Sequence, residues 1–144
     1  MQSIEEIILQ DIKTTLDSAE GFTSGTVFRF SQMGHAYETV PCIDIVFDKT
    51  FLLKQINNLS EYEMTVFINV IARDESANTD AYMDALLYSI RKALMRDPGR
   101  GGHARSTEIK RIETGLIVTG QPEVERLITL SIIYRIQTKN PEKN

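Results

Sequence analysis

Three charged residues make the clearest case for catalysis in this chain. Glu108 and Lys110 have the Glu-x-Lys form seen at some metal-dependent nuclease sites, and Asp44 could supply a second carboxylate for Mg²⁺. Such pairs arise by chance in charged chains. Asp44 and Asp48 share one predicted strand, but their Cα atoms lie about 13 Å apart, too far for one metal ion to take both. A small metal-dependent nuclease therefore stays open only as an alternative.

The remaining reactive residue types have no partners at useful spacing. His35 and His103 are the only histidines, and neither has a cysteine or an acid at metal-ligand spacing, so we expect solvated loop histidines. Cys42 is the only cysteine, which rules out a disulfide within the chain and predicts a small buried apolar residue. We therefore predict no catalytic residue, no metal and no cofactor.

The glycine-rich segment at residues 99–102 matches a phosphate-binding loop in composition alone. A phosphate loop needs its glycines after a strand and just before a helix. Here they follow a predicted helix and precede a predicted strand, so the negative end of the helix dipole faces them. Bound nucleotide is therefore disfavoured. Bases in the last turns of that helix complement its dipole, whereas Arg100 and Arg105 are predicted to be free to contact a partner or a phosphate backbone.

Two predicted helices and five predicted strands position these residues. A Ser-x-x-Glu capping pattern at Ser3 and Glu6, followed by apolar residues at 3.6-residue spacing, predicts a first helix over residues 3–19. A second apolar stripe predicts a helix over residues 79–96. Strand-like patterns occupy residues 26–31, 42–48, 61–72, 108–120 and 124–137.

The order of these elements, α-β-β-β-α-β-β, predicts the fold class. Each of the two helices has an apolar stripe that must be buried, and one apolar face of a sheet can bury both. This predicts a single α+β domain over residues 1–139. Both helices should pack on one face of a mainly antiparallel sheet. Residues 50–60 are predicted to form an extended loop or a turn of helix, and residues 140–144 a flexible polar tail.

Charge is distributed unevenly along a chain whose net charge is −4. Residues 1–20 carry five acids and one lysine, whereas residues 91–111 carry seven bases and two acids. These segments can pair within the fold or between copies of it. The acidic balance and the lack of aromatic residues in the basic loop argue against independent DNA binding. No apolar run approaches the ~18 residues that span a bilayer, so we expect no membrane partner.

The order of elements resembles that of the tail terminator proteins of long-tailed bacteriophages, also called tail completion or minor tail proteins. The resemblance covers most of the chain and rests on patterns rather than on a fingerprint motif. Those patterns are a first strand at 27–30, a Pro-led strand at 40–48 that ends in an acid, a long strand at 64–73, a helix at 79–96 and a closing strand at 129–136.

The resemblance implies a structural virion protein without enzymatic activity. It implies a homohexameric ring that caps the tail tube, ends its polymerisation and offers a joining surface to a head-completion or connector protein. DNA would pass through the lumen. The expected location is the head-proximal end of the virion tail, with the host cytoplasm before assembly. A head–tail connector or a tail-tube protein remains an alternative.

By position, the resemblance places contacts with neighbouring subunits or with the tube in the 100–105 loop and in residues 51–60. The predicted interface residues come from these two segments and their borders: Arg96, Arg100, His103, Arg105, Phe51, Leu52, Lys54 and Asn57. Charge reversal at Arg100 and Arg105 is expected to weaken assembly while changing the stability of the monomer by no more than about 1 kcal/mol.

Overall fold

The computed structural model describes residues 2–22, 26–29, 41–73, 79–114 and 123–137. Within these residues, two helices and five strands follow one another in the predicted order, and the sheet is mostly antiparallel, which confirms the α+β class. The elements are α1 (Ile4–Asp17), β1 (Val27–Arg29), β2 (Cys42–Ile56), β3 (Leu59–Arg73), α3 (Thr79–Met95), β4 (Ser106–Thr114) and β5 (Glu123–Gln137).

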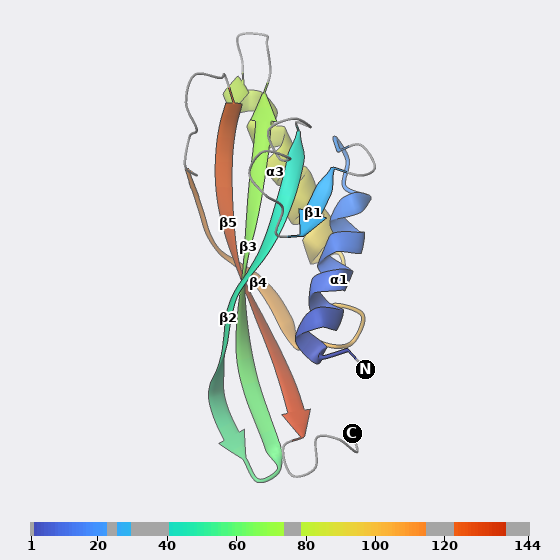
Figure 1. Ribbon diagram of the computed structural model, residues 1–144, viewed down its shortest axis with the longest axis vertical. Helices are drawn as coiled ribbons and strands as arrows, with labels where there is room; N and C mark the ends of the chain where they lie inside the picture. The colour runs from blue at the N-terminus through green and yellow to red at the C-terminus, as the bar shows by residue number, and fades with distance from the viewer. Residues whose placement is uncertain (1, 23–25, 30–40, 74–78, 115–122, 138–144) are drawn as a thin grey trace.

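The sheet has the strand order β1-β2-β3-β5-β4. The short β1 pairs parallel with β2, and the other neighbours pair antiparallel. Strands β2, β3 and β5 have 15 residues each, so each extends for roughly 50 Å at ~3.3 Å per residue. Figure 1 shows these three strands running the length of the molecule with a strong twist, while both helices lie beside only part of that length.

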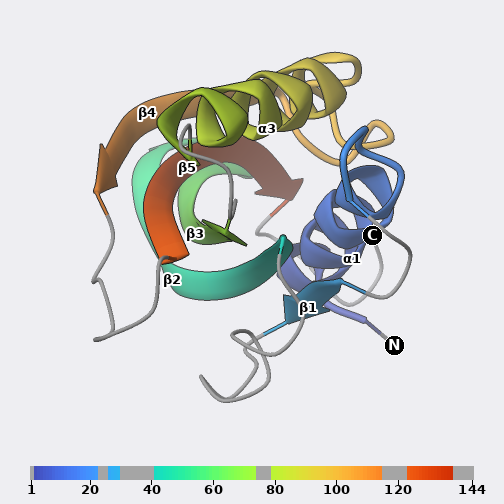
Figure 2. The ribbon, with the colours of Figure 1, turned by 90° about the horizontal axis from the view of Figure 1, so that it is seen from above.

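The core lies between the helices and one face of the sheet. Both helices pack on this face, and in the view along the strands the sheet curls beside them (Figure 2). Alternate residues of β3 and β5 point into the core, as their period-2 patterns predicted, and the helices supply apolar stripes. Fully buried members of this core include Ile8, Ile12, Leu16, Met64, Val66, Ile68, Val70, Ile90, Leu130 and Ile132.

The capping pattern predicted for α1 is half realised. The Ser3 hydroxyl accepts a hydrogen bond from the backbone N–H of Glu6 at 3.1 Å. The Glu6 carboxylate, however, accepts hydrogen bonds from both terminal nitrogens of Arg29, one of them at 3.1 Å. The bond to Arg29 lowers the pKa of Glu6. The residue that a capping box would turn back onto the helix therefore fastens α1 to β1 instead.

The prediction of a loop or helical turn over residues 50–60 is wrong. β2 continues to Ile56, turns through Asn57 and Asn58, and returns as β3. Asn57 has φ of 54°, a left-handed conformation that asparagine adopts more readily than most residues and that two-residue hairpin turns require. Register shifts between Phe47 and Lys49 and between Leu52 and Lys54 interrupt the alternation of side chains. The predicted strand therefore ended near the first bulge, because the alternation of apolar and polar residues breaks there.

The boundaries of the other elements follow the sequence closely, within the described residues. The strand predicted at 26–31 is described as Val27–Arg29, and the strand predicted at 108–120 as Ser106–Thr114. His35 and the tail at 140–144 lie outside the described residues. Within the described part of the chain, no helix is long and apolar enough to cross a membrane.

Candidate assembly surfaces

The residues predicted to make contacts fall into two regions of different character. The first is the segment that connects α3 to β4, here called the 97–105 loop. The second is the β2–β3 hairpin arm, defined as residues 47–59. His103, Arg105 and Arg96 are exposed at or beside the loop, and Phe51, Leu52, Lys54 and Asn57 are exposed on the arm. Arg100 is the exception, because its side chain is completely buried.

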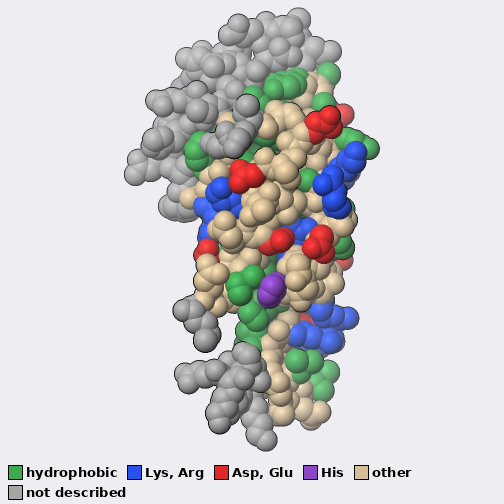
Figure 3. Space-filling model, turned by 90° about the vertical axis from the view of Figure 1, so that its right-hand side faces the viewer, with side chains coloured by type: hydrophobic (Ala, Val, Ile, Leu, Met, Phe, Trp, Pro, Cys, Tyr) green, Lys and Arg blue, Asp and Glu red, His purple; other side chains and the backbone are tan. Residues whose placement is uncertain are grey.

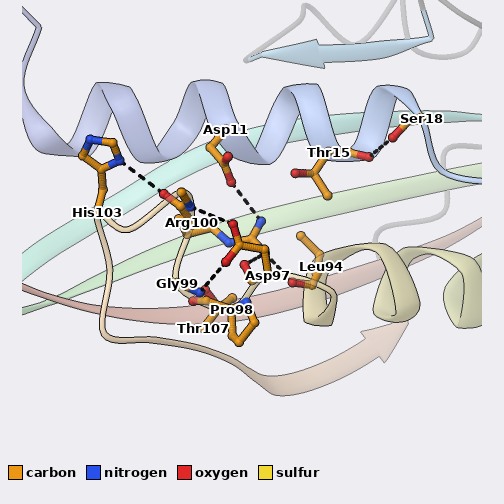
Figure 4. A network of polar contacts seen from close by, with 11 residues as sticks. Asp11, Thr15, Ser18, Leu94, Asp97, Pro98, Gly99, Arg100, His103 and Thr107 are labelled. Carbon is orange, nitrogen blue, oxygen red and sulfur yellow. Dashed lines mark hydrogen bonds and ion pairs between the residues drawn. The ribbon is translucent and has the colours of Figure 1, made fainter.

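Arg100 closes the C-terminal end of α3 from inside the fold (Figure 4). Its guanidinium donates hydrogen bonds from Nη2 to the backbone carbonyls of Leu94 and Asp97. Its Nη1 lies 3.2 Å from Oδ2 of Asp11 on α1, an ion pair without hydrogen-bond geometry. Burial lowers the pKa of Arg100, and the carboxylates of Asp11 and Asp97 oppose that shift. The side chain thus joins α1, α3 and the loop at one buried point.

The 97–105 loop is held by its own hydrogen bonds. The Asp97 carboxylate accepts hydrogen bonds from the backbone N–H groups of Gly99 and Gly101 at 3.2 and 2.9 Å. Gly101 has φ of 68°, which glycine adopts without strain, and Arg100 itself has φ of 49°. The Thr107 hydroxyl donates to the Pro98 carbonyl at 2.8 Å, which ties the loop to β4.

Arg100 is therefore not a free surface cation, and the expectation that its charge reversal would leave stability nearly unchanged is wrong. The physical reason is the helix end that precedes it. The last carbonyls of a helix lack intrahelical partners and carry the negative end of the dipole, so a cation six residues later can fold back to meet them. The acidic first helix also meets the basic segment here, within one copy, through Asp11.

Arg105 is exposed and forms an ion pair with Glu61. Its Nη1 lies 2.8 Å from Oε2 of Glu61 on β3, and Nε of Arg135 on β5 lies 2.8 Å from the same oxygen. Lys54 on β2 approaches the other carboxylate oxygen at 3.8 Å. Hydrogen bonds from Arg135 and then Arg105 lower the pKa of Glu61. Three cations around one carboxylate leave the base of the hairpin arm with a net positive charge.

The hairpin arm carries most of the exposed large apolar side chains of the described residues. Six lie on it: Phe47, Phe51, Leu52, Leu53, Ile56 and Leu59, which are 40–58% exposed. By strand register, Phe47 and Leu52 share the helix-facing side of the sheet, and Phe51, Ile56 and Leu59 share the opposite side. Figure 1 shows this arm extending beyond the helices, and Figure 3 shows hydrophobic and basic side chains together at that end.

The sequence identified part of this arm and missed the rest. Phe51, Leu52, Lys54 and Asn57 were predicted as contacts. Phe47 lies outside the predicted contact segment 51–60, whereas Leu53, Ile56 and Leu59 lie inside it but were not named, because the segment was predicted to be a loop. The available signal was a run of β-compatible apolar residues that ends in two asparagines, a residue type that is common in turns and at the ends of strands.

Of the three residues named for the nuclease alternative, Asp44 lies apart from Glu108 and Lys110. Asp44 on β2 and Glu108 on β4 are separated by two intervening strands, which places them at least ~14 Å apart across the sheet. Lys110 lies 2.8 Å from Glu108, and both side chains are more than half exposed. Among the described residues, no three His, Cys, Asp or Glu side chains gather as metal ligands would. The site proposed for this alternative is therefore not assembled.

Cys42 occupies the place predicted for it. It is fully buried against Ile71 and Phe28 in a small cluster on the sheet face away from the helices. Burial raises the pKa of its thiol to about 12, so the thiol stays protonated at neutral pH. A protonated, buried thiol is a poor nucleophile.

Comparison with known proteins adds no name to these surfaces. No protein-family model matches the chain, and no curated protein matches it. The geometry of the described residues therefore carries the functional argument, together with the resemblance in element order.

Proposed function

We propose that this chain is a structural assembly protein of a bacteriophage tail, a tail terminator that associates with copies of itself into a ring and caps the tail tube. The order of elements supports this reading. So does the contrast between a well-packed domain and an arm that no described part of the same chain covers. The ring would stop tube polymerisation and present its other face to a head-completion or connector protein.

The exposed apolar hairpin arm is the observation that carries the proposal. Six large apolar side chains at about half exposure amount to on the order of 500 Å² of apolar surface on one projecting element. The largest apolar patch on a typical soluble monomer is about this size and is often functional. Because apolar side chains point from both faces of the arm, contact on one flat surface would leave half of them in water. Contacts with neighbouring molecules on both sides of the arm would cover both of its faces.

The arm and the helix-covered body are unlike surfaces. A contact between unlike surfaces repeats head to tail, and it closes into a ring when the rotation between copies allows. Such a ring has two different faces, which a cap between a tube and a connector requires. The basic residues at the base of the arm, Lys54, Arg105 and Arg135, would steer an acidic partner surface toward it.

Electron microscopy of the purified chain tests the proposal and separates it from its alternative. A terminator should give rings of uniform diameter that do not grow into tubes, and it should seal the open ends of tail tubes assembled without it. A tail-tube protein would instead polymerise into tubes of variable length. A chain that stays monomeric and leaves tube ends free to grow would overturn the proposal. Robust DNA cleavage with Mg²⁺, lost in Glu108→Ala, would also do so.

A further inference from the structure

Within the described residues, both lateral edges of the sheet are open along much of their length. β1 pairs with β2 only at residues 43–45, so among the described residues no strand covers the outer edge of β2 from Val46 to Ile56. In the part of the chain that the structure describes, β4 is the last strand on the other side and pairs with β5 alone. Open edges expose unpaired backbone N–H and C=O groups, which readily pair with a strand from another chain.

We propose that residues 49–56 of β2 pair with residues 106–113 of β4 from the next copy, so that one sheet continues from subunit to subunit. This inference rests on the proposed function, since it names the contact that builds the ring. Each neighbouring pair from β2 through β3 and β5 to β4 is antiparallel, so β2 and β4 run in opposite directions. A rotation about an axis along the strands preserves those directions. β4 of the next copy therefore meets β2 as an antiparallel partner.

The charges on the sheet face away from the helices select one register. Lys49 and Lys54 of β2 lie on this face, and Glu108 and Glu113 of β4 lie on the same face. Pairing Lys49 with Glu113 brings Lys54 opposite Glu108 once the bulged residue in each strand is passed over. Opposite charges directly across strands stabilise a sheet, and like charges destabilise it. Both pairs of this register are therefore favourable.

The positions between these charged pairs are also compatible. Phe51 falls opposite Arg111 on the same face, where a guanidinium can lie over the aromatic ring. On the helix-facing side, Leu52 falls opposite Ile109. Leu52 is 48% exposed and Ile109 is partly buried, so pairing would cover apolar surface that one copy leaves in water.

The bulges give this pairing its selectivity. β2 has a register shift at Leu53, and β4 has one at Lys110. A bulge twists an edge away from a regular strand, which protects it against casual pairing. In the proposed register the two bulges fall on adjacent rungs. An edge that carries the matching irregularity can follow the bent strand, and a regular strand cannot.

The register also implies a stagger suited to a closed ring. Within one copy, Lys49 and Glu108 lie on the same rung of the sheet, meaning the same row of residues paired across the strands. Lys49 pairs with Thr65, Thr65 with Ser131, and Ser131 with Glu108. The proposed contact places Glu108 opposite Lys54 of the neighbour, four rungs further along β2 when the bulged Leu53 is omitted. The proposed contact thus shifts the register by four residues for every four strands, a ratio of one. Closed barrels with eight strands and a shear of about 8 have the same ratio, and their strands tilt by ~36° from the barrel axis.

Two charge-reversed variants test the contact. The first carries Lys49→Glu and Lys54→Glu, and the second carries Glu108→Lys and Glu113→Lys. Alone, each variant places like charges at every contact and should stay monomeric at a concentration at which the wild type assembles. Mixed in equal amounts, the two should assemble in alternation, because one contact is native and the other has both charges exchanged. Mass in solution and electron microscopy read the outcome, and thermal melts verify that each variant folds.

A disulfide readout does not depend on charge. Lys54→Cys combined with Glu108→Cys should give covalent oligomers on oxidation, because within one copy these positions are separated by two strands, ~14 Å or more. Lys49→Cys with Glu108→Cys is the matched control, displaced by four rungs or ~13 Å, and should not cross-link. Cys42, the only native cysteine, is fully buried and adds no background.

The results separate this inference from the proposed function. If the wild type forms rings but each reversed variant also forms them alone and the Lys54–Glu108 pair does not cross-link, the edge contact is wrong and the ring stands. If the wild type never associates and never caps tubes, both proposals fall. Assembly only on mixing, with cross-links in the predicted pair alone, would establish the contact.

Discussion

The 97–105 loop and the β2–β3 hairpin arm both looked like contact surfaces in the sequence, and they differ in what the chain itself satisfies. The loop turns its central cation inward, where Arg100 meets two carbonyls and Asp11. The arm leaves its apolar side chains on both faces in water. Polar groups in a loop can find partners nearby, whereas apolar side chains on a projecting hairpin need another molecule. The loop therefore contributes to fold stability, and the arm is the surface to which our proposal assigns assembly.

Replacing Arg100 with Met should have the largest effect on the fold. The change removes a buried cation and leaves the carbonyls of Leu94 and Asp97 and the carboxylate of Asp11 without it. We expect the free energy of unfolding to fall by about 3 kcal/mol in urea denaturation. The matched control is Arg105→Met, which should cost no more than about 1 kcal/mol because Arg105 is exposed and Glu61 keeps Arg135. Equal losses in the two variants would contradict a structural role for Arg100.

Replacing Asp97 with Ala should have a smaller effect on the same loop. Its carboxylate accepts two backbone hydrogen bonds, from Gly99 and Gly101, at an exposed position. We expect a loss of about 1 kcal/mol. Asp97→Asn retains one acceptor oxygen and should lose about half as much. Amide hydrogen exchange at Gly99 and Gly101 should accelerate in Asp97→Ala, and unchanged exchange there would argue that the loop does not need this residue.

Glu61 should make the base of the arm sensitive to acid. Its pKa is lowered in the folded state, chiefly by Arg135, so its contribution to stability is fully present above the unfolded value of about 4.3 and is lost as the pH falls through the lowered folded value. Glu61→Gln should therefore show a shallower fall in stability below about pH 4.3 than the wild type. Arg135→Gln should flatten that fall more than Arg105→Gln, and an unchanged slope in all three would contradict the cluster.

Substitutions on the arm should affect the fold least. Leu53→Ser with Ile56→Ser changes side chains that are 44% and 58% exposed, so unfolding of the monomer should shift by no more than about 0.5 kcal/mol for each residue. Association should be lost. Ile45→Ala, at a 1% exposed core position, provides the contrast, with an expected loss of about 2–5 kcal/mol, roughly four to ten times the loss per arm residue. A large destabilisation by the arm substitutions would mean that the arm serves the fold.

Much of the fold followed from periodicity alone. Strands β3 and β5 alternate cleanly, and α1 has an apolar stripe with a capping serine, so their type and buried faces were predictable. The outer part of β2 was not predictable in the same way, because two bulges break its alternation. The alternation of apolar and polar residues in a strand shows which of its residues face a core. The outer part of β2 lies beyond the helices and packs on no core that the described residues form, so its sequence need not alternate.

The candidate site residues also differ in whether their surroundings could be predicted from the local sequence. Lys54 and Phe51 were found as exposed residues because local composition reports exposure. The burial of Arg100 was missed because it depends on Asp11, nearly ninety positions earlier in the chain, and on a left-handed backbone at Arg100 itself. Long-range partners of this kind come from the fold and not from the neighbouring sequence.

Sedimentation of the purified chain over a range of concentrations, beside the Leu53→Ser and Ile56→Ser double variant, tests the central claim most directly. The account predicts that the wild type sediments as one discrete oligomer that is ring-shaped in electron micrographs, while the folded double variant stays monomeric. A wild type that remains monomeric at every concentration, or a double variant that assembles as the wild type does, would contradict it.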